Sequence, residues 1–493
     1  MITRLEIDGF KNFIQTDLYF GPFTCVAGEN GVGKSNLFDV IQFISHLADH
    51  PFTEAATHLR QVDATSITGQ SIRGIFRRTG TRLHPTIRLG IEMLIAPEGT
   101  DDLGQSATAT YNFLRYELEL QLDQSGEQDI IRLVRESLVP IRKGDAKAHL
   151  LFDHATKWRN EIIQGRRTVP FISTTRNDEG KSLVNLHQDG GTGGKPQPFA
   201  AENLPRTILS TTRYAGEHPT AVLVRREMQS WRRLQLEPSA LRNPSDLDQL
   251  SLRHARLGDD GSNIASTVYR LANRSSEVYR DKEEVYATLT NDLRELMEDV
   301  KGISVDRDEK RRLLVLQVLT KENTLLPARS LSDGTLRFLA LAILAMDVQE
   351  TGLVCMEEPE NGIHPERIPA ILELLQTIPV DPKDVPSEEN RLRQVILNTH
   401  SPSVVMEVPD DSLLYAGLQE RIVEGLRTRV TFFKCLRDTW RNRAGTPTIP
   451  RGRLLAYLNP RSVESRWYDR VEHQTRVKER SDLTELQGTL FHE

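Results

Sequence analysis

The sequence predicts an α/β protein with a mixed sheet, an antiparallel β subdomain and a helical insert. Continuous apolar strands at 353–356 and 394–397 alternate with helical runs, as in a parallel sheet that is covered on both faces. Between residues 86 and 139, apolar and polar residues alternate instead, which indicates antiparallel strands with one covered face. Residues 220–300 have helical periodicity, which indicates a helical insert.

Length and composition limit the classes of protein that fit. At 493 residues the chain is longer than one core usually allows, so we expect one large lobe or two joined lobes. The net charge of -6 excludes a general affinity for nucleic acid or anionic membranes. The three cysteines have no C-x-x-C spacing, which argues against a disulfide framework and a zinc site and fits the cytoplasm. No apolar run suits a signal peptide or a membrane span.

A glycine-rich loop lies between an apolar strand at 23–27 and a helical run at 36–47. The loop has the phosphate-binding pattern G-x-x-x-x-G-K-S and runs Gly28-Glu29-Asn30-Gly31-Val32-Gly33-Lys34-Ser35. Its glycines allow the backbone NH groups to point at one polyphosphate. We expect Lys34 to reach the β and γ phosphates and Ser35 to complete the shell of a Mg²⁺ ion. The strand before and the helix after argue against the alternative, a merely structural turn.

Adjacent carboxylates follow the buried strand at 353–356, at the strand end where α/β proteins place their ligands. In this position Glu357 is expected to hold Mg²⁺ through water. Glu358 is expected to orient or partly deprotonate the water that attacks a γ phosphate. The alternative is a solvated acidic start of a helix, because Glu before Pro often precedes a first turn.

Two further motifs have both a structural and a functional interpretation. His400 ends the strand that is expected to neighbour the carboxylate strand, and it is a candidate to hydrogen-bond the γ phosphate or the attacking water. A lone histidine is more often structural. The turn at 332–335 opens an apolar helix at 336–346, which makes it either an anion site at a helix N-terminus or an N-cap.

Taken in order, these motifs resemble those of an ABC-type ATPase head, a P-loop NTPase of the RecF/SMC group. Residues 28–35 match the Walker A motif and residues 331–335 resemble the signature motif. Residues 353–358 resemble Walker B with its catalytic glutamate, residues 361–364 occupy the D-loop position, and His400 matches the switch histidine. The resemblance covers residues 1–47 and 303–415, and residues 220–300 more loosely.

The resemblance implies roles for individual residues. The nucleotide-binding residues would be Gly28, Asn30, Gly31, Gly33, Lys34, Ser35 and Asn36. The signature residues that act on the nucleotide of another head would be Ser332, Asp333, Gly334 and Thr335. The D-loop residues would be Asn361, Gly362 and His364. Catalysis would rest on Glu358, His400 and Lys34, and the metal ligands would be Ser35 and Glu357.

Residues 9–13 and 357–365 are particularly similar to RecF-related ATPases, which include ATPase subunits of OLD-, Septu- and PARIS-like phage-defence systems. Residues 260–263 also resemble that group. The chain departs from the pattern in three places. Glu357 stands where Asp is usual, Asp333 and Thr335 replace the Gly and Gln of the signature, and no glutamine can be assigned to the Q-loop. Gln61 and Gln70 are the candidates for it.

The resemblance implies a Mg²⁺-dependent ATP phosphohydrolase that forms an ATP-sandwiched homodimer, or a higher oligomer built from dimers. Two functions remain open. In one, ATP-dependent assembly gates a separately encoded effector, such as a nuclease or a toxin, in antiphage defence. In the alternative, the chain is a RecF-like, DNA-binding ATPase of DNA repair or recombination. A Toprim nuclease would follow residue 420, but no suitable D-x-D is found there, so we expect no nuclease in this chain.

We expect four parts in the chain. Residues 1–139 form the N-terminal half of the head with Walker A, and residues 140–300 form an insert that is largely helical in its second half. Residues 301–420 form the C-terminal half with the signature, Walker B and the switch histidine. Residues 421–493 form a basic tail region. Residues 189–195, with four glycines, are expected to form a mobile loop or a hairpin tip.

Paired basic residues are candidates for contacts with DNA phosphates. A helix expected at 222–236 carries Arg225-Arg226 and Arg232-Arg233, and residues 434–453 hold six further basic residues. The alternative is a solvated charged face. Further helices are expected at 262–272 and 277–298.

Overall fold

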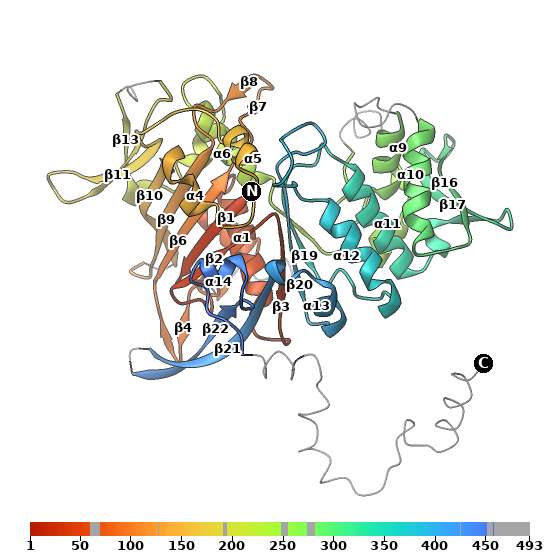
Figure 1. Ribbon diagram of the computed structural model, residues 1–493. Coiled ribbons are helices and arrows are strands. Elements are labelled where there is room, and N and C mark those ends of the chain that lie inside the picture. The colour runs from red at the N-terminus through yellow and green to blue at the C-terminus, as the bar shows by residue number, and fades with distance from the viewer. Residues whose placement is uncertain are drawn as a thin grey trace, which may run out of the picture. The chain divides into compact units, whose positions relative to one another are not determined.

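The computed structural model describes residues 1–59, 70–126, 128–190, 195–247, 255–273, 282–423, 425–450 and 457. Residues 1–448 form one compact unit, and a second unit begins at residue 449. The first unit contains a six-stranded sheet, an eight-stranded sheet and a helical region (Figure 1).

The six-stranded sheet has the order β14-β19-β20-β3-β21-β22. Its strands are β14 (Arg232–Leu234), β19 (Gly352–Glu357), β20 (Arg393–Thr399), β3 (Phe23–Ala27), β21 (Leu413–Val423) and β22 (Leu426–Lys434). All neighbours pair in parallel except β22, which is antiparallel to β21. Every residue of β3 and β20 is buried, in keeping with the apolar runs at 25–27 and 395–397 within them.

The eight-stranded sheet is antiparallel and has the order β13-β12-β11-β10-β9-β6-β1-β2. Its strands are β1 (Ile2–Asp8), β2 (Thr16–Tyr19), β6 (Thr86–Leu94), β9 (Phe113–Asp123), β10 (Ile130–Pro140), β11 (Ile172–Arg176), β12 (Ser182–Leu186) and β13 (Gln197–Ala200). Burial alternates along β9, as the sequence predicts for a strand with one covered face. One hydrophobic cluster joins this sheet to helix α1 (Lys34–Leu47) and to β20.

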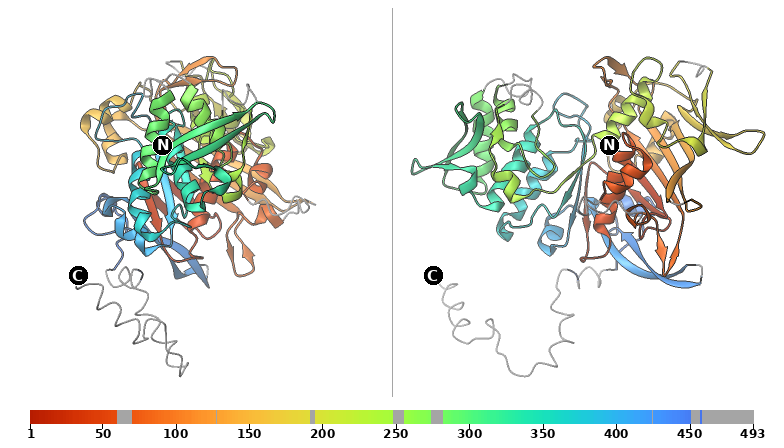
Figure 2. Two further views of the ribbon diagram at one scale, coloured as in Figure 1. Left: turned by 90° about the vertical axis from the view of Figure 1, so that its right-hand side faces the viewer. Right: turned by 180° about the vertical axis from the view of Figure 1, so that it is seen from behind.

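The helical region contains the helices α7 (Pro238–Arg242), α9 (Ile264–Asn273), α10 (Lys282–Arg294), α11 (Asp333–Met346) and α12 (Ile368–Thr377). A small antiparallel sheet packs with it, formed by β15 (Ser245–Asp246), β16 (Val300–Asp308), β17 (Leu313–Thr320) and β18 (Leu325–Pro327). Figures 1 and 2 show the helical region and the eight-stranded sheet on opposite sides of the six-stranded sheet.

Shorter elements complete the unit. The helices are α2 (Phe52–Thr57), α3 (Gln70–Arg73), α4 (Ala146–His149), α5 (Thr156–Ile162), α6 (Pro219–Gln229), α13 (Pro402–Glu407) and α14 (Trp440–Arg443). The strands are β4 (Arg78–Thr79), β5 (Arg82–Leu83), β7 (Glu98–Thr100) and β8 (Ser106–Thr108). In the described part of the chain, no helix combines the length and the apolar character that a membrane span requires.

The helix expected at 222–236 is wrong in its second half. Helix α6 ends at Gln229, and residues 232–234 form strand β14, which pairs in parallel with β19. The pairing places Arg232 and Arg233 at the edge of the six-stranded sheet. Helical periodicity across this segment misled the interpretation because a strand of three residues is too short to show an alternation of its own.

The division into four domains stays a prediction. Strand pairing within the sheets, however, spans each of its three boundaries. Strand β11, in the expected insert, pairs with β10 and extends the sheet of the N-terminal half. Strand β14, also in the insert, belongs to the six-stranded sheet. Strand β22, in the expected tail, closes the other edge of that sheet. Residues 191–194 lie outside the described residues, and β12 and β13 on either side of them form a hairpin.

Candidate nucleotide-binding site

The six-stranded sheet brings the predicted motifs together at one edge. Strands β19, β20 and β3 are parallel neighbours, and their register pairs Glu357 with Asn398 and Thr399 with Ala27. The carboxyl ends of the three strands are therefore level. The carboxylates after β19, His400 after β20 and the glycine-rich loop after β3 all begin at this edge, which is where open α/β sheets bind ligands.

The loop after β3 requires glycine for steric reasons. Gly31 and Gly33 have φ angles of 78° and 99°, a region that side chains rarely adopt. A Cβ atom on Gly33 would lie 2.5 Å from the side chains of Asn12 and Thr431, and one on Gly28 would lie 2.4 Å from the carbonyl oxygen of Ala416. The loop is held against its surroundings and leads directly into α1.

Lys34 is buried at the first position of α1. Its Nζ donates hydrogen bonds to the carbonyl oxygens of Gly28 and Glu29, at 2.7 Å and 2.9 Å. Burial lowers the pKa of Lys34, while the nearby carboxylates of Glu358, Glu360 and Glu357 oppose that shift. The side chain thus curls over the loop and lies close to the carboxylate cluster that follows β19.

Two residues that the sequence interpretation did not single out support the loop from behind. Thr431, on β22, donates a hydrogen bond to the carbonyl oxygen of Val32 at 2.6 Å, and Asn12 hydrogen-bonds Thr431. Asn36 on α1 donates to Asn12 at 2.8 Å. Asn12 lies in the RecF-like string at 9–13, which was a usable signal, whereas Thr431 lies in the expected tail and had none.

The predicted base and the predicted switch histidine are in contact. Nδ1 of His400 lies 2.6 Å from Oε1 of Glu358. The backbone NH of Glu358 donates to the carbonyl oxygen of Asn398 at 3.0 Å, and its φ of 45° lies in the left-handed region. This conformation costs backbone strain for a non-glycine residue, and strained residues cluster at active sites. Both side chains remain partly exposed, so a water molecule or a phosphate has access to them.

Glu357 takes part in a network that the sequence did not reveal. Arg233 on β14 donates to Glu357 at 2.5 Å and to Asp39 of α1 at 2.9 Å. Lys11 forms an ion pair with the other oxygen of Asp39. Arg233 is therefore a positioning residue that links the strand edge, α1 and the carboxylate assigned to the metal.

Glu360 is a buried carboxyl group beside this site. Its Oε1 accepts a hydrogen bond from the hydroxyl of Thr399, and its Oε2 has no hydrogen-bond partner. Burial raises the pKa of Glu360, and the nearby negative charge of Glu358 acts in the same direction. The sequence places Glu360 among the acidic residues after β19 but gives it no role.

The signature and D-loop residues meet each other in a separate hollow of about 480 Å³. Its lining includes Ser332, Gly334, Thr335, Gly362 and His364. The hydroxyl of Ser332 accepts a hydrogen bond from the backbone NH of Thr335 at 3.2 Å, so Ser332 is the N-cap of α11. A Cβ on Gly334 would lie 2.8 Å from the carbonyl oxygen of Gly362, which shows how closely the two motifs pack.

The remaining predicted residues are placed as follows. Asp333 forms an ion pair with Arg242, and Arg337 donates a hydrogen bond to the carbonyl oxygen of Asn361. Asn30 and Ser35 are exposed on the loop and at the start of α1. Gln61 lies outside the described residues, and of Gln70 only the backbone is described, as the first residue of α3.

Two of the paired arginines that were candidates for DNA contacts, or for a solvated charged face, are instead engaged within the protein. Arg225 is buried and pairs with Asp49 and Asp102, and Arg232 is buried and pairs with Asp259 and Glu350. Of the tail arginines, Arg441 is fully buried. These side chains hold elements of the fold together and are not available to phosphates.

The residues present fit a nucleotide and its metal ion. The loop offers glycines at positions where a Cβ would collide, a buried lysine and the start of a helix of 14 residues. Ser35 and Glu357 would hold Mg²⁺, and Gly28, Asn30, Gly31, Gly33, Lys34 and Asn36 would hold the phosphates. Carboxylate and hydroxyl oxygens are the ligands that Mg²⁺ prefers.

Comparison with known proteins gives a match to one family model and matches to curated relatives. Residues 199–407 match a family described as "AAA domain, putative AbiEii toxin, Type IV TA system". The "DNA replication and repair protein RecF" of Paenarthrobacter aurescens (strain TC1) is 26% identical over 180 residues, which are 35% of this chain and 43% of that protein. The "Chromosome partition protein Smc" of Thauera aminoaromatica is 25% identical over 128 residues, 26% of this chain and 9% of that protein. The chain thus spans less than half the length of these curated relatives.

Solved structures also match. The Smc head bound to the C-winged helix domain of ScpA covers 88% of this chain and 98% of its own, at 14% identity and a TM-score of 0.42. The SMC head domain from Thermotoga maritima covers 87% of this chain and 98% of its own, at 12% identity and a TM-score of 0.35.

Proposed function

We propose that this chain, which resembles RecF/SMC-like, ABC-type ATPases in its motifs and its matched relatives, hydrolyses ATP between two assembled copies. The contact between Glu358 and His400 carries the proposal, because it places a carboxylate and an imidazole together at the edge of the sheet where the phosphate loop begins. ATP is the substrate, and its phosphates would rest on residues 28–36.

The chemistry follows from what each side chain offers. Glu358 is placed to orient the attacking water and to accept its proton, and His400, by donating its NH to the carboxylate, fixes that orientation. Lys34 supplies positive charge against the phosphates. Mg²⁺, when bound, would neutralise phosphate charge, held by Ser35 and Glu357. Arg233 would set the position of Glu357 through its ion pair.

Assembly is proposed because the phosphate loop and the signature residues, which together would enclose a nucleotide, lie in different places on one chain. The signature residues at the start of α11 line a hollow to which neither the phosphate loop nor Glu358 contributes. The N-terminus of a helix of 14 residues, capped by Ser332, suits an anion. In a symmetric pair, this end of α11 would complete the nucleotide site of the other copy.

ATP hydrolysis by two variants tests the catalytic assignment. Lys34→Ala removes the phosphate-binding charge, and we expect it to abolish nucleotide binding. Glu358→Gln keeps the shape of the side chain but cannot accept the proton, so we expect normal binding and a fall in kcat of about 100-fold or more. A Glu358→Gln protein with normal turnover would overturn the assignment of the base.

We further propose that ATP-dependent assembly gates a separately encoded effector, such as a nuclease or toxin, in antiphage defence. The description of the matched family, "putative AbiEii toxin, Type IV TA system", links similar proteins to a toxin system but names no separate effector. The burial of Arg225 and Arg232 also removes two of the side chains that were candidates for a DNA-binding surface. A RecF-like role in DNA repair is the second candidate, favoured by the RecF relatives.

Proteins that co-purify with Glu358→Gln from the native host distinguish the two roles. The protein is isolated in ATP and Mg²⁺, and Lys34→Ala serves as the control that cannot bind nucleotide. A nuclease or toxin enriched only with Glu358→Gln supports the gated effector. Repair proteins together with nuclease-sensitive DNA support the RecF-like role, and strong stimulation of hydrolysis by DNA would agree with them.

A further inference from the structure

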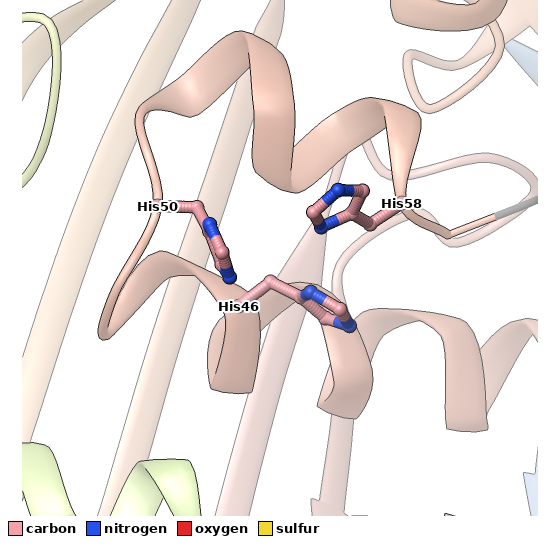
Figure 3. Close-up of side chains that lie close together, drawn as sticks. All are labelled: His46, His50 and His58. Carbon is pink, nitrogen blue, oxygen red and sulfur yellow. The ribbon is translucent and has the colours of Figure 1, made fainter.

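Three histidines meet at the far end of the helix that begins at the phosphate loop. His46 lies in the last turn of α1, His50 in the turn between α1 and α2, and His58 directly after α2. Figure 3 shows the three imidazole rings gathered in the space between the two helices. One ring nitrogen from each residue lies within 4.8 Å of those of the other two.

We infer that His46, His50 and His58 bind a divalent transition-metal ion of the zinc class. Three imidazole nitrogens with an open fourth position are a common ligand set for Zn²⁺, and the pair His46 and His50 has the spacing H-x₃-H found in zinc sites. Imidazole also suits Cu²⁺ and Ni²⁺, whereas Mg²⁺ prefers oxygen. The site is therefore chemically distinct from the nucleotide site.

The geometry is close to that of a metal centre. The ring centroids lie 4.9 Å to 5.9 Å apart, and the rings of His50 and His58 are nearly perpendicular. Tetrahedral Zn²⁺ with bonds of about 2.05 Å requires nitrogen atoms about 3.3 Å apart. The nitrogen atoms need to approach by roughly 1.5 Å at most, a distance within reach of rotations about side-chain bonds, because none of the three rings is fully buried.

A second observation supports a ligand at this place. Oε1 of Glu54, on α2, lies 2.9 Å from Nδ1 of His50 and 4.0 Å from Nε2 of His58. Metal-binding histidines commonly donate their second NH to a carboxylate, which fixes the orientation of the ring. Glu54 is placed to act in this way on His50, leaving the other ring nitrogen of His50 for the metal.

Binding would connect two elements that the backbone joins only through a short turn. The ion would tie the last turn of α1 to the end of α2, and α1 carries Lys34 at its opposite end. Since a metal ion that binds the folded state alone stabilises it, the site would raise the thermal stability of the protein.

The test uses the untagged, full-length protein after treatment with a chelator and in the absence of nucleotide. Titration with Zn²⁺ in a calorimeter is expected to give one site per chain, and Co²⁺ is expected to give the strong visible absorption of a four-coordinate ion. The variants His50→Gln and His58→Gln, singly and together, are expected to lose both signals. His154→Gln, at a histidine elsewhere in the fold, is expected to keep them.

Glu54→Gln gives a graded readout. Because Glu54 would act on a ligand and not on the metal, its loss is expected to weaken the affinity for Zn²⁺ by about 10- to 100-fold without abolishing binding. The Tm of the wild-type protein is expected to rise when Zn²⁺ is added. The Tm of the His50→Gln, His58→Gln double variant is expected to stay the same.

Two results would overturn the inference. One is a wild-type protein that binds no stoichiometric Zn²⁺. This result does not depend on whether any variant folds. The other is a His50→Gln, His58→Gln double variant that binds Zn²⁺ as tightly as the wild type, which would place the metal elsewhere.

Discussion

Glu136 on β10 is a fully buried carboxyl group in the eight-stranded sheet. It accepts hydrogen bonds from the backbone NH groups of Ile208 and Leu209, at 2.7 Å and 2.9 Å, and from the hydroxyl of Tyr116 at 3.0 Å. Burial nevertheless dominates and raises the pKa of Glu136 to about 7. The folded protein therefore holds a proton on this group at pH values where the unfolded chain has released it.

This shift predicts the direction of a pH dependence. From about pH 4.5, the ordinary pKa, to about pH 7 the folded state binds more protons, so the contribution of Glu136 to stability is present at low pH and is lost as the pH rises. The total change is on the order of 3 kcal/mol. Glu136→Gln cannot titrate, so the stability difference between wild type and variant should change across this window in favour of the variant as the pH rises. Urea unfolding at a series of pH values measures it, and a constant difference would contradict the prediction.

At the scale of elements, the phosphate loop offers a matched pair of glycines. Gly31 and Gly33 both have positive φ, so an alanine at either position costs about 1–2 kcal/mol in backbone strain. A Cβ added at Gly33 would collide with the side chains of Asn12 and Thr431, whereas the space around Gly31 is open. The two substitutions therefore separate strain from collision.

We expect Gly33→Ala to weaken ATP binding at least tenfold more than Gly31→Ala. The added Cβ would displace Thr431, which holds the loop through Val32, and an extra cost of about 1.4 kcal/mol is enough for a tenfold loss of affinity. Titration with a fluorescent ATP analogue measures the affinities, and urea unfolding checks that both variants fold. Equal losses in the two variants would mean that Asn12 and Thr431 do not support the loop.

Elements with long patterns could be predicted from the sequence, and short ones could not. The expected helix at 336–346 and the strands at 353–356 and 394–397 are confirmed as α11, β19 and β20, because each has an apolar run or periodicity of its own. Strand β14 has three residues and depends on its pairing with β19. No local sequence pattern predicts such a strand.

The same distinction holds within the site. The meeting of Glu358 and His400 follows from the order of two buried strands, which the sequence displays. Arg233 and Thr431 reach the site from segments more than 100 residues away from the residues they hold, and their positions depend on the packing of edge strands. The histidine cluster lies around a turn and a short helix. The sequence was searched for a zinc site only through its cysteine spacing, which does not detect a site made of histidines.

At the scale of the whole molecule, the question is whether the nucleotide site is completed by a second copy. Ser332 allows a test that leaves the fold intact. Ser332→Asp keeps an N-cap that is as good as serine, but it brings a negative charge to the place where a γ phosphate would dock. Ser332→Asn also keeps the cap and adds no charge, so it is the matched control.

Mixing two inactive proteins then tests for a shared site. Lys34→Ala lacks a working phosphate loop and Ser332→Asp lacks a working signature, so each homodimer should be inactive. If the copies exchange at random, half of the dimers in an equal mixture are mixed, and each mixed dimer has one site with an intact loop and an intact signature. ATP turnover of the mixture should therefore recover to about one quarter of the wild-type rate, in keeping with a symmetric dimer. A site completed within one chain would give no recovery, and in that case α11 would have to act on its own loop.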